Sequence, residues 1–493
     1  MRRLLLGACT TLAGLSVAML SAPGCGSDSA GDGGGGPAEG CVGLFCDDTD
    51  GSAPPADQKC INGACQTICE GGGDTTLSGT VYDPAGKVPI YNALVYVPST
   101  ATAEPLGEGA ACDRCDAAVK NPITLAATDT SGAFVLKNVP VGGTIPLVVQ
   151  IGKWRRVVEI ASDKRCEDTP IDAGLTRLPR NRAEGDIPRM AVATGSADPL
   201  QCLLKKIGID DAEFGVAGTD ARIHLYKGGG HVRDSVYKEA SGKFAGGPDF
   251  VDAETLWGSV DELKKYDVVL LACEGSENDT IDSAPHKPDG AKQAVYDYAK
   301  AGGRLFTTHF HHTFFSSSPD PAPRGVATWT TSILPDPAPG NPETTPVLAD
   351  IVGTFPKAVA MKEWLQKQDA LEGGKLSLLD ARHNVDAVNP TGLAWIQAPS
   401  NPSLSGTPPH AVQYLSFNAP VGAPDDEVCG RVVFSNLHVG AGTEGALQDD
   451  ATADFPTSCQ TKNLNAQQKA LEFMLFDLSS CVQNDTRPPV LPK

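Results

Sequence analysis

The chain has 493 residues, enough for two or three folded domains, each with a hydrophobic core of its own. Its formal net charge of −20 argues against a nucleic-acid partner, because contact with a phosphate backbone needs a basic surface. These numbers predict a multidomain protein that does not bind nucleic acid.

Residues 1–25 have the pattern of a secretory signal. Arg2 and Arg3 precede an apolar run over residues 4–20, and small residues follow it. The run is too short, and is followed too soon by Gly and Ser, to serve as a membrane span. The sequence therefore predicts a protein that leaves the cytoplasm.

The residues around Cys25 resemble a bacterial lipoprotein processing site. Gly24 and Cys25 are followed by Gly, Ser and Asp, and processing at such a site leaves the cysteine as a lipidated N-terminus. The sequence departs from the pattern at Ala22-Pro23, where lipoproteins prefer a larger aliphatic residue. The resemblance implies an exported protein at the periplasm or the outer surface, anchored in the membrane by a lipid on Cys25. The alternative is an ordinary secretory signal with a spare cysteine.

Fifteen cysteines in an exported chain make disulfide bonds the default. Residues 26–74 are rich in Gly, Ser and Asp and predict a flexible tether. Within it we expect a small disulfide knot rather than a metal site, because its cysteines lack CxxC spacing and nearby histidines: Cys41, Cys46, Cys60, Cys65 and Cys69. The odd number of cysteines left after the leader and the anchor implies a free thiol, and Cys273, inside a buried strand, is the expected one.

Residues 75–160 alternate between apolar and polar side chains, with turn sequences DPAG (83–86) and DTSG (129–132) between the runs. This pattern predicts an antiparallel β-sandwich. The segments LSGTVYDPAGKVPIYNALVYVP (77–98) and TDTSGAFVLKNVPVGG (128–143) resemble the carboxypeptidase regulatory-like family, which implies a transthyretin-like sandwich. An insertion at residues 99–122 carries Cys112 and Cys115. This CxxC lies in a loop rather than beside a helix, so we expect a structural role and no redox activity.

Residues 161–186 are polar and predict a linker, and residues 482–493 predict a disordered tail. Between them, residues 187–481 alternate between strand and helix patterns, which predicts a doubly wound α/β domain with a mostly parallel sheet. The central strands are expected at residues 268–272 and 304–308. An amphipathic helix is expected at residues 466–478, capped near Asn465.

Three segments of this domain resemble the class I glutamine-amidotransferase-like fold, and more closely its ThuA-like branch: YDVVLLACEG (266–275), AGGRLFTTHFHH (301–312) and GRVVFSNLHVG (430–440). The resemblance covers residues 187–478 and implies a flavodoxin-like or amidotransferase-like sheet. In the glutamine-hydrolysing members the nucleophilic cysteine follows the second of these strands, where this chain has His309. Cys273 ends the preceding strand instead, next to Glu274, whose charge raises a thiol pKa. We therefore expect no glutamine amidotransferase activity.

Histidines gather at the predicted strand ends, where open α/β sheets bind ligands. His309 and His311 alternate along what is taken as an extended segment, so they are expected to share a face, and His438 matches the family's late histidine. This pattern predicts His309, His438 and Glu274 as catalytic residues and a tentative zinc site made by His309, His311 and His438. Further ligand contacts are expected from His311, His312, Phe310 and Asp279.

The resemblance implies a carbohydrate-type ligand, for which the neighbouring aromatic rings offer a stacking surface: Phe310, Phe314, Phe315 and Trp329. The sequence thus predicts a lipid-anchored surface protein that binds or processes such a ligand, with a divalent metal such as zinc as the expected cofactor. An alternative remains open, in which the histidines form a hydrogen-bonded turn without chemistry and the chain is a non-catalytic surface or interaction module.

Overall fold

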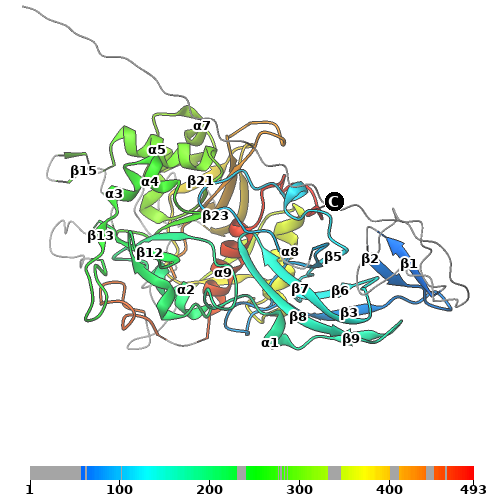
Figure 1. Cartoon of the computed structure of the whole chain (residues 1–493). Coiled ribbons are helices and arrows are strands. Elements are labelled where there is room, and N and C mark those ends of the chain that lie inside the picture. The colour runs from blue at the N-terminus through cyan, green and yellow to red at the C-terminus, as the bar shows by residue number, and fades with distance from the viewer. Residues whose placement is uncertain are drawn as a thin grey trace, which may run out of the picture. The chain divides into compact units, whose positions relative to one another are not determined.

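The computed structural model describes residues 57–492 except 62–63, 101–102, 230–239, 276, 278–279, 282–283, 286, 331–345, 400–409, 440–448 and 461–462. The predicted signal segment, Cys25, the first part of the tether and Asp279 lie outside the described residues. Within the described part, no helix combines the length and the apolar character that crossing a bilayer requires. The chain forms several sheets, is rich in β-structure and has helices mainly in its second half (Figure 1).

Two sheets form in the region where the sandwich is predicted. The first has the strand order β6-β3-β9, with β3 (Thr76–Thr80), β6 (Ala133–Leu136) and β9 (Asp168–Pro170). The second has the order β5-β4-β7-β8, with β4 (Leu94–Val97), β5 (Thr124–Ala127), β7 (Gly143–Ile151) and β8 (Trp154–Ser162). Apolar side chains of both sheets share one buried cluster. Strand β9 falls in the predicted linker but pairs with β3, so the sheet extends beyond residue 160.

The end of the predicted tether differs from the prediction. Residues 57–67 include a hairpin of β1 (Gln58–Ile61) and β2 (Ala64–Thr67). A disulfide between Cys69 and Cys166 fastens this segment to the chain beside β9. Covalent closure holds a stretch that is too poor in apolar residues to form a core.

The second half is built on a wide mixed sheet. Its parallel part has the order β11-β12-β10-β14-β17-β24, and β13 pairs with β12. The bounds of these strands are β10 (Met190–Ala193), β11 (Phe214–Val216), β12 (Ile223–Lys227), β13 (Val251–Asp252), β14 (Val268–Leu271), β17 (Arg304–Thr308) and β24 (Gly430–Ser435).

Beyond β24 the sheet continues in antiparallel pairings through β23 (His410–Ala419), β22 (Leu393–Pro399), β19 (Val347–Ile351) and β20 (Leu376–Leu378). The prediction of a mostly parallel sheet therefore describes only one part of it. Residues 420–429 join β23 to β24 without a crossover helix, and a connection of that kind permits antiparallel pairing.

Helices cover both faces of the parallel strands. Met190 and Val268 belong to a buried cluster that includes α2 (Leu200–Lys206), α8 (Pro356–Lys367) and α9 (Ala466–Ser479). Their neighbours Ala191 and Val269 belong to a second cluster with α3 (Glu254–Trp257), α4 (Val260–Leu263), α5 (Asp289–Lys300) and α6 (Thr313–Ser316). Successive strand residues face opposite sides, so both faces are buried, as the unbroken apolar run at residues 268–272 predicts.

The remaining short elements complete the described part of the chain. The helices are α1 (Ala173–Thr176) and α7 (Pro321–Arg324), with 3-10 turns at η1 (Cys115–Ala117), η2 (Asp211–Glu213) and η3 (His309–His312). The short strand pairs are β15 (Thr280–Ile281) with β16 (Ala284–Pro285), and β18 (Ala327–Trp329) with β21 (Val385–Val388).

Helix α9 joins the two halves of the protein. A capping box at Asn465 and Gln468 starts the helix, at the cap that the sequence predicts. One side packs on the wide sheet, while Phe473 stacks on Tyr91 at 5.8 Å and Phe476 meets Trp154 at 5.7 Å, both from the first half. Figure 1 shows α9 beside β7 and β8. The halves therefore share a continuous hydrophobic core.

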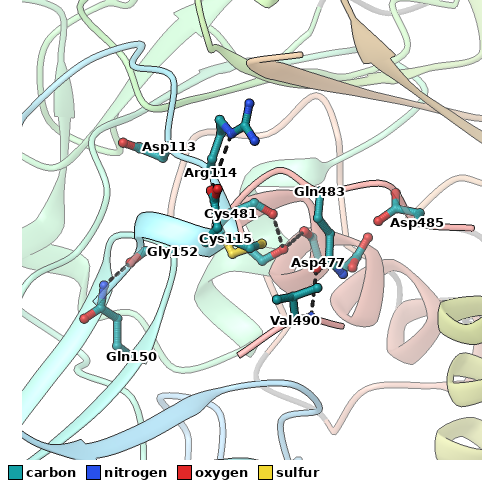
Figure 2. Close-up of a disulfide and its surroundings, with 12 residues drawn as sticks. Asp113, Arg114, Cys115, Gln150, Gly152, Asp477, Cys481, Gln483, Asp485 and Val490 are labelled. Carbon is teal, nitrogen blue, oxygen red and sulfur yellow. Dashed lines mark hydrogen bonds and ion pairs between the residues drawn. A yellow bond between two sulfur atoms is a disulfide. The ribbon is translucent and has the colours of Figure 1, made fainter. Parts of the chain in front are cut away.

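Two disulfides bind the insertion of the first half to the second. Cys112 pairs with Cys429, and Cys115 pairs with Cys481 directly after α9 (Figure 2). The structural role predicted for this CxxC is confirmed, since each cysteine pairs with a distant partner and not with the other. A further disulfide joins Cys202 to Cys459.

The predicted disordered tail differs from the structure as far as residue 492. Asp485 is 3% exposed and lies 2.8 Å from Lys357 and 2.7 Å from Arg431. Both cations also contact Asp477 near the end of α9. Buried cations need counter-charges, so the polar tail supplies one, which no apolar pattern in the sequence reveals.

Replacing both Cys115 and Cys481 by Ser should lower the free energy of unfolding by about 2–5 kcal/mol, because the bridge restrains a loop that spans most of the chain. Denaturant titration without reductant measures this loss. A Cys273→Ala variant removes a thiol but no bridge, and it is the matched control. Equal stability of the double variant and the wild type would contradict a stabilising role for the bridge.

A second prediction concerns Glu472 on α9, which is fully buried beside Asp83 of the first half. Burial, with the Asp83 charge, raises the pKa of Glu472 well above 4.5 against the opposing effect of Lys469. Burial likewise raises the pKa of Asp83 to about 6. Stability from such groups is fully present below their unfolded-state pKa and is lost as pH rises through the folded-state pKa.

A Glu472→Gln variant should therefore match the wild type in stability at pH 4 and exceed it as pH rises above that. Denaturant titrations across this range measure the difference, with Glu159→Gln as the exposed control. Parallel stability–pH curves for the wild type and Glu472→Gln would contradict the assignment.

Candidate functional site

The carboxyl ends of three neighbouring parallel strands bring a thiol and two imidazoles together. Strands β14, β17 and β24 are adjacent in the sheet, with Leu271 opposite Thr307 and Thr308 opposite Ser435. Cys273 follows β14, His309 follows β17, and His438 follows β24. Because the strands end at the same edge, residues far apart in sequence meet there.

The three side chains are in close mutual contact and almost completely buried. One donor atom from each of Cys273, His309 and His438 lies within 4.8 Å of the others. The Sγ of Cys273 is 3.2 Å from Nδ1 of His309, and the two imidazole centroids are 5.3 Å apart. The exposed fractions are 0%, 2% and 1%, respectively. We call this group the Cys–His–His cluster.

A sharp turn directs His309 into the cluster. Thr308 still has extended backbone, whereas His309 has a φ of +42°, a left-handed value that is uncommon outside glycine, and a 3-10 turn begins there. The expectation that His309 and His311 alternate along an extended segment is therefore wrong, because residues 309–312 are helical. The strand itself ends at Thr308, as the sequence predicts.

Asp380, in the segment after β20, fixes the orientation of His438. Its carboxylate Oδ2 lies 2.9 Å from Nδ1 of His438, and Arg382 pairs with the same carboxylate. A carboxylate only accepts hydrogen bonds, so Nδ1 carries the proton that it donates to Asp380. The other ring nitrogen is thereby turned toward the sulfur of Cys273.

Charge interactions set the titration of the site. Burial alone lowers the pKa of His438, but the Cys273 sulfur and the Asp380 carboxylate outweigh it and raise that pKa to about 10. The pKa of His309 is instead well below 6.5, because of burial and the neighbouring His438 charge. Burial raises the pKa of Asp380, but hydrogen bonding to His438 and the charges of His438 and Arg382 lower it below 3.8 overall.

A second carboxyl group, Asp198, lies in the loop after β10 and is fully buried. Its Oδ1 accepts a hydrogen bond of 2.7 Å from the backbone N–H of Val439. Burial raises its pKa to about 6, although the charge of nearby His438 opposes the rise. The end of β10 therefore adds a titratable group to this edge of the sheet.

The other predicted histidines lie outside the cluster. The Nε2 of His311 is 2.8 Å from the carbonyl oxygen of Ala272, and its ring stacks on Phe314. His312 contacts Ser316 and Glu277 at 3.0 and 3.1 Å. The structure thus brings His309 and His438 together as predicted, but the thiol of Cys273 takes the place expected for His311.

Two further predicted residues are placed as follows. The carboxylate of Glu274 lies 2.9 Å from Nζ of Lys287 and accepts a hydrogen bond from Gly229 N–H, so it forms a buried ion pair rather than part of the cluster. Phe310 is 8% exposed, and its ring centroid is 3.8 Å from that of His309. No sequence pattern identifies Asp380, which follows the short strand β20 and lies three residues before His383.

A cavity with a volume of about 280 Å³ lies elsewhere. Its lining includes Cys115, Gly152 and Cys481, from both halves of the protein (Figure 2). It also includes Val268 and Arg304 at the amino ends of β14 and β17, whereas the cluster follows the carboxyl ends of these strands. Its charged groups are paired, for example Lys153 with Asp267 at 2.6 Å. Volume alone is weaker evidence for chemistry than convergent, charge-coupled side chains.

The geometry of the cluster permits two kinds of chemistry. The order thiol, imidazole and carboxylate in Cys273, His438 and Asp380 is that of an activated nucleophile with its base and orienting group. The same thiol and both imidazoles also form a ligand set suited to a zinc-type ion. Both kinds of chemistry use Cys273, which follows β14. The turn after β17, where the glutamine-hydrolysing enzymes have their nucleophilic cysteine, carries His309 in this chain.

No protein-family model and no curated protein matches the sequence. Among solved structures, a ThuA-like protein from Bacteroides uniformis is similar at 10% identity over 55% of this chain and 87% of its own, with a TM-score of 0.27. A cohesin–X-dockerin complex from Acetivibrio cellulolyticus is similar at 18% identity over 30% of this chain and 79% of its own, with a TM-score of 0.15. Scores of this size do not establish a shared fold.

Replacing Asp380 by Asn should lower the pKa of His438 from about 10, because the charged acceptor that stabilises the imidazolium is removed. NMR titration of histidine-labelled protein in the presence of a chelator measures this change. Asp386→Asn is the matched control, since Asp386 pairs with His383 at 2.8 Å. An unchanged His438 titration in the Asp380 variant would contradict the coupling.

Proposed function

We propose that this chain is an exported, lipid-anchored protein whose second half binds and hydrolytically processes a carbohydrate-type ligand at the Cys–His–His cluster. The observation that carries the proposal is the convergence of Cys273, His309, His438 and Asp380 at the carboxyl edge of three adjacent parallel strands. Strongly shifted pKa values at such an edge are typical of catalytic sites.

The residues have separable roles in this proposal. Asp380 accepts the Nδ1 hydrogen bond and so orients the ring of His438, whose pKa of about 10 leaves a proton on Nε2 that it can donate beside Cys273. His309, with its lowered pKa, remains neutral and presents a lone pair. Glutamine amidotransferase activity is not part of the proposal, because the turn after β17 carries an imidazole instead of a thiol.

The ThuA-like assignment and the carbohydrate class rest on the sequence resemblance. The order β12-β10-β14-β17-β24 supports it, since it corresponds to the 2-1-3-4-5 order of flavodoxin-like sheets. Trp329, which is partly exposed and stacks on the buried rings of Phe315 and His312, is the aromatic side chain that would contact a sugar in this proposal. Export is supported by the four disulfides among the described residues.

A non-catalytic surface module is the second candidate. Burial favours it, because each member of the cluster is at most 2% exposed among the described residues, and a substrate needs access. In that case the cluster would serve only to stabilise the sheet edge.

Hydrolysis of chromogenic glycosides and acetylated sugars by the full mature chain separates these candidates. A His438→Ala variant should lose activity by roughly 10²–10⁴-fold, the usual contribution of a general acid–base group. The control is His410→Ala, an exposed residue of β23. Activity that survives His438→Ala, or no turnover and no oligosaccharide binding by the wild type, would contradict the proposal.

A further inference from the structure

We propose that Cys273, His309 and His438 are the protein ligands of one divalent ion of the zinc type. This inference rests on the proposed function and changes one role in it, because Nε2 of His438 would bind the ion and the proton transfer would pass to the metal-bound water. The binding of the ion, however, depends only on the geometry of the cluster and not on the identity of any substrate.

The spacing of the donors fits a tetrahedral ion. Zinc bonds of about 2.3 Å to sulfur and about 2.0 Å to nitrogen place two tetrahedral ligands roughly 3.3–3.6 Å apart. The distance from Cys273 Sγ to His309 Nδ1 is 3.2 Å, and all three donors fall within 4.8 Å. Small side-chain adjustments are therefore sufficient to close the ligand set.

The hydrogen bonding of His438 is that of a metal-bound imidazole. Ligating histidines usually donate their second N–H to a carboxylate, which fixes the tautomer and strengthens the donor. His438 does so through Nδ1 to Asp380 at 2.9 Å. Its Nε2 is buried beside the Cys273 sulfur, the neighbour with which it would share the ion, and metal binding would release the proton that it carries at neutral pH.

The donor types select the metal. One thiolate and two imidazoles suit zinc and related transition ions, whereas magnesium and calcium prefer oxygen ligands. Three protein ligands leave a fourth position of the tetrahedron open, which is the arrangement of catalytic rather than structural zinc sites. A bound zinc-type ion there supplies an acidified water molecule for hydrolysis.

The ligand set differs from the one that the histidine pattern predicts, and this difference makes the inference testable. His311 directs Nε2 to the carbonyl oxygen of Ala272 and is not among the three residues whose donor atoms lie within 4.8 Å of one another. Cys273→Ala should therefore abolish stoichiometric metal binding, while His311→Gln should retain it. Asp380→Asn should weaken zinc affinity by about 10–100-fold, the usual effect of removing an outer carboxylate.

Elemental mass spectrometry of the tag-free full mature chain, after zinc loading and removal of excess zinc, measures metal content. Cobalt substitution tests the wild type independently of any variant, because a cobalt–thiolate charge-transfer band requires cysteine coordination. Near-stoichiometric zinc and this band support the inference. Loss of metal from His311→Gln with retention in Cys273→Ala, or the absence of both signals in the wild type, would overturn it.

Failure of this inference is distinguishable from failure of the proposed function. Hydrolysis that persists in the presence of a strong zinc chelator would overturn the metal site and leave the catalytic proposal in place. Bound metal without turnover of any sugar derivative would support the metal site and remove the proposed hydrolysis.

Discussion

The burial of helix α9 is the constraint on which the rest of the structure depends. The helix is apolar enough on all sides to pack on the wide sheet with one side and on the β-rich first half with the other. Hydrophobic burial of this kind is the dominant favourable term in folding. Because α9 packs against both halves, separating them would expose apolar side chains of α9 and of the half it leaves. This explains why aromatic contacts, buried ion pairs and two disulfides gather around the end of α9.

The cluster is a consequence of strand order. Cys273 and His438 are separated by many elements in sequence, yet β14 and β24 both neighbour β17, so their carboxyl ends are held at a fixed spacing. The sequence predicts the meeting of His309 and His438, because each follows an apolar strand. It does not predict the left-handed backbone at His309, nor that His311 pairs with the carbonyl oxygen of Ala272 instead of joining the cluster. That turn depends on packing between segments distant in sequence, which the local pattern of apolar and polar residues does not reveal.

The sequence predicts the individual strands and helices better than it predicts which of them pair or pack together. Alternating residues and DPAG-type turns predict the strands of the first half, and the apolar run at 268–272 predicts a strand buried on both faces. The antiparallel part of the wide sheet, the contribution of β9 and the ordered tail at Asp485 are not predicted. Each depends on partners distant in sequence, and a polar segment that neutralises buried cations looks like any other polar segment.

The covalent links between the halves also bear on how the protein responds to proteases. Cys112–Cys429 and Cys115–Cys481 connect the first half to the end of the second, across separations of 317 and 366 residues. A single cut in the polar stretch between the halves would leave both pieces joined by these bridges. Such a nick would therefore leave the half that bears the cluster attached to the first half. Separation of the two pieces would require a reductant as well as a protease.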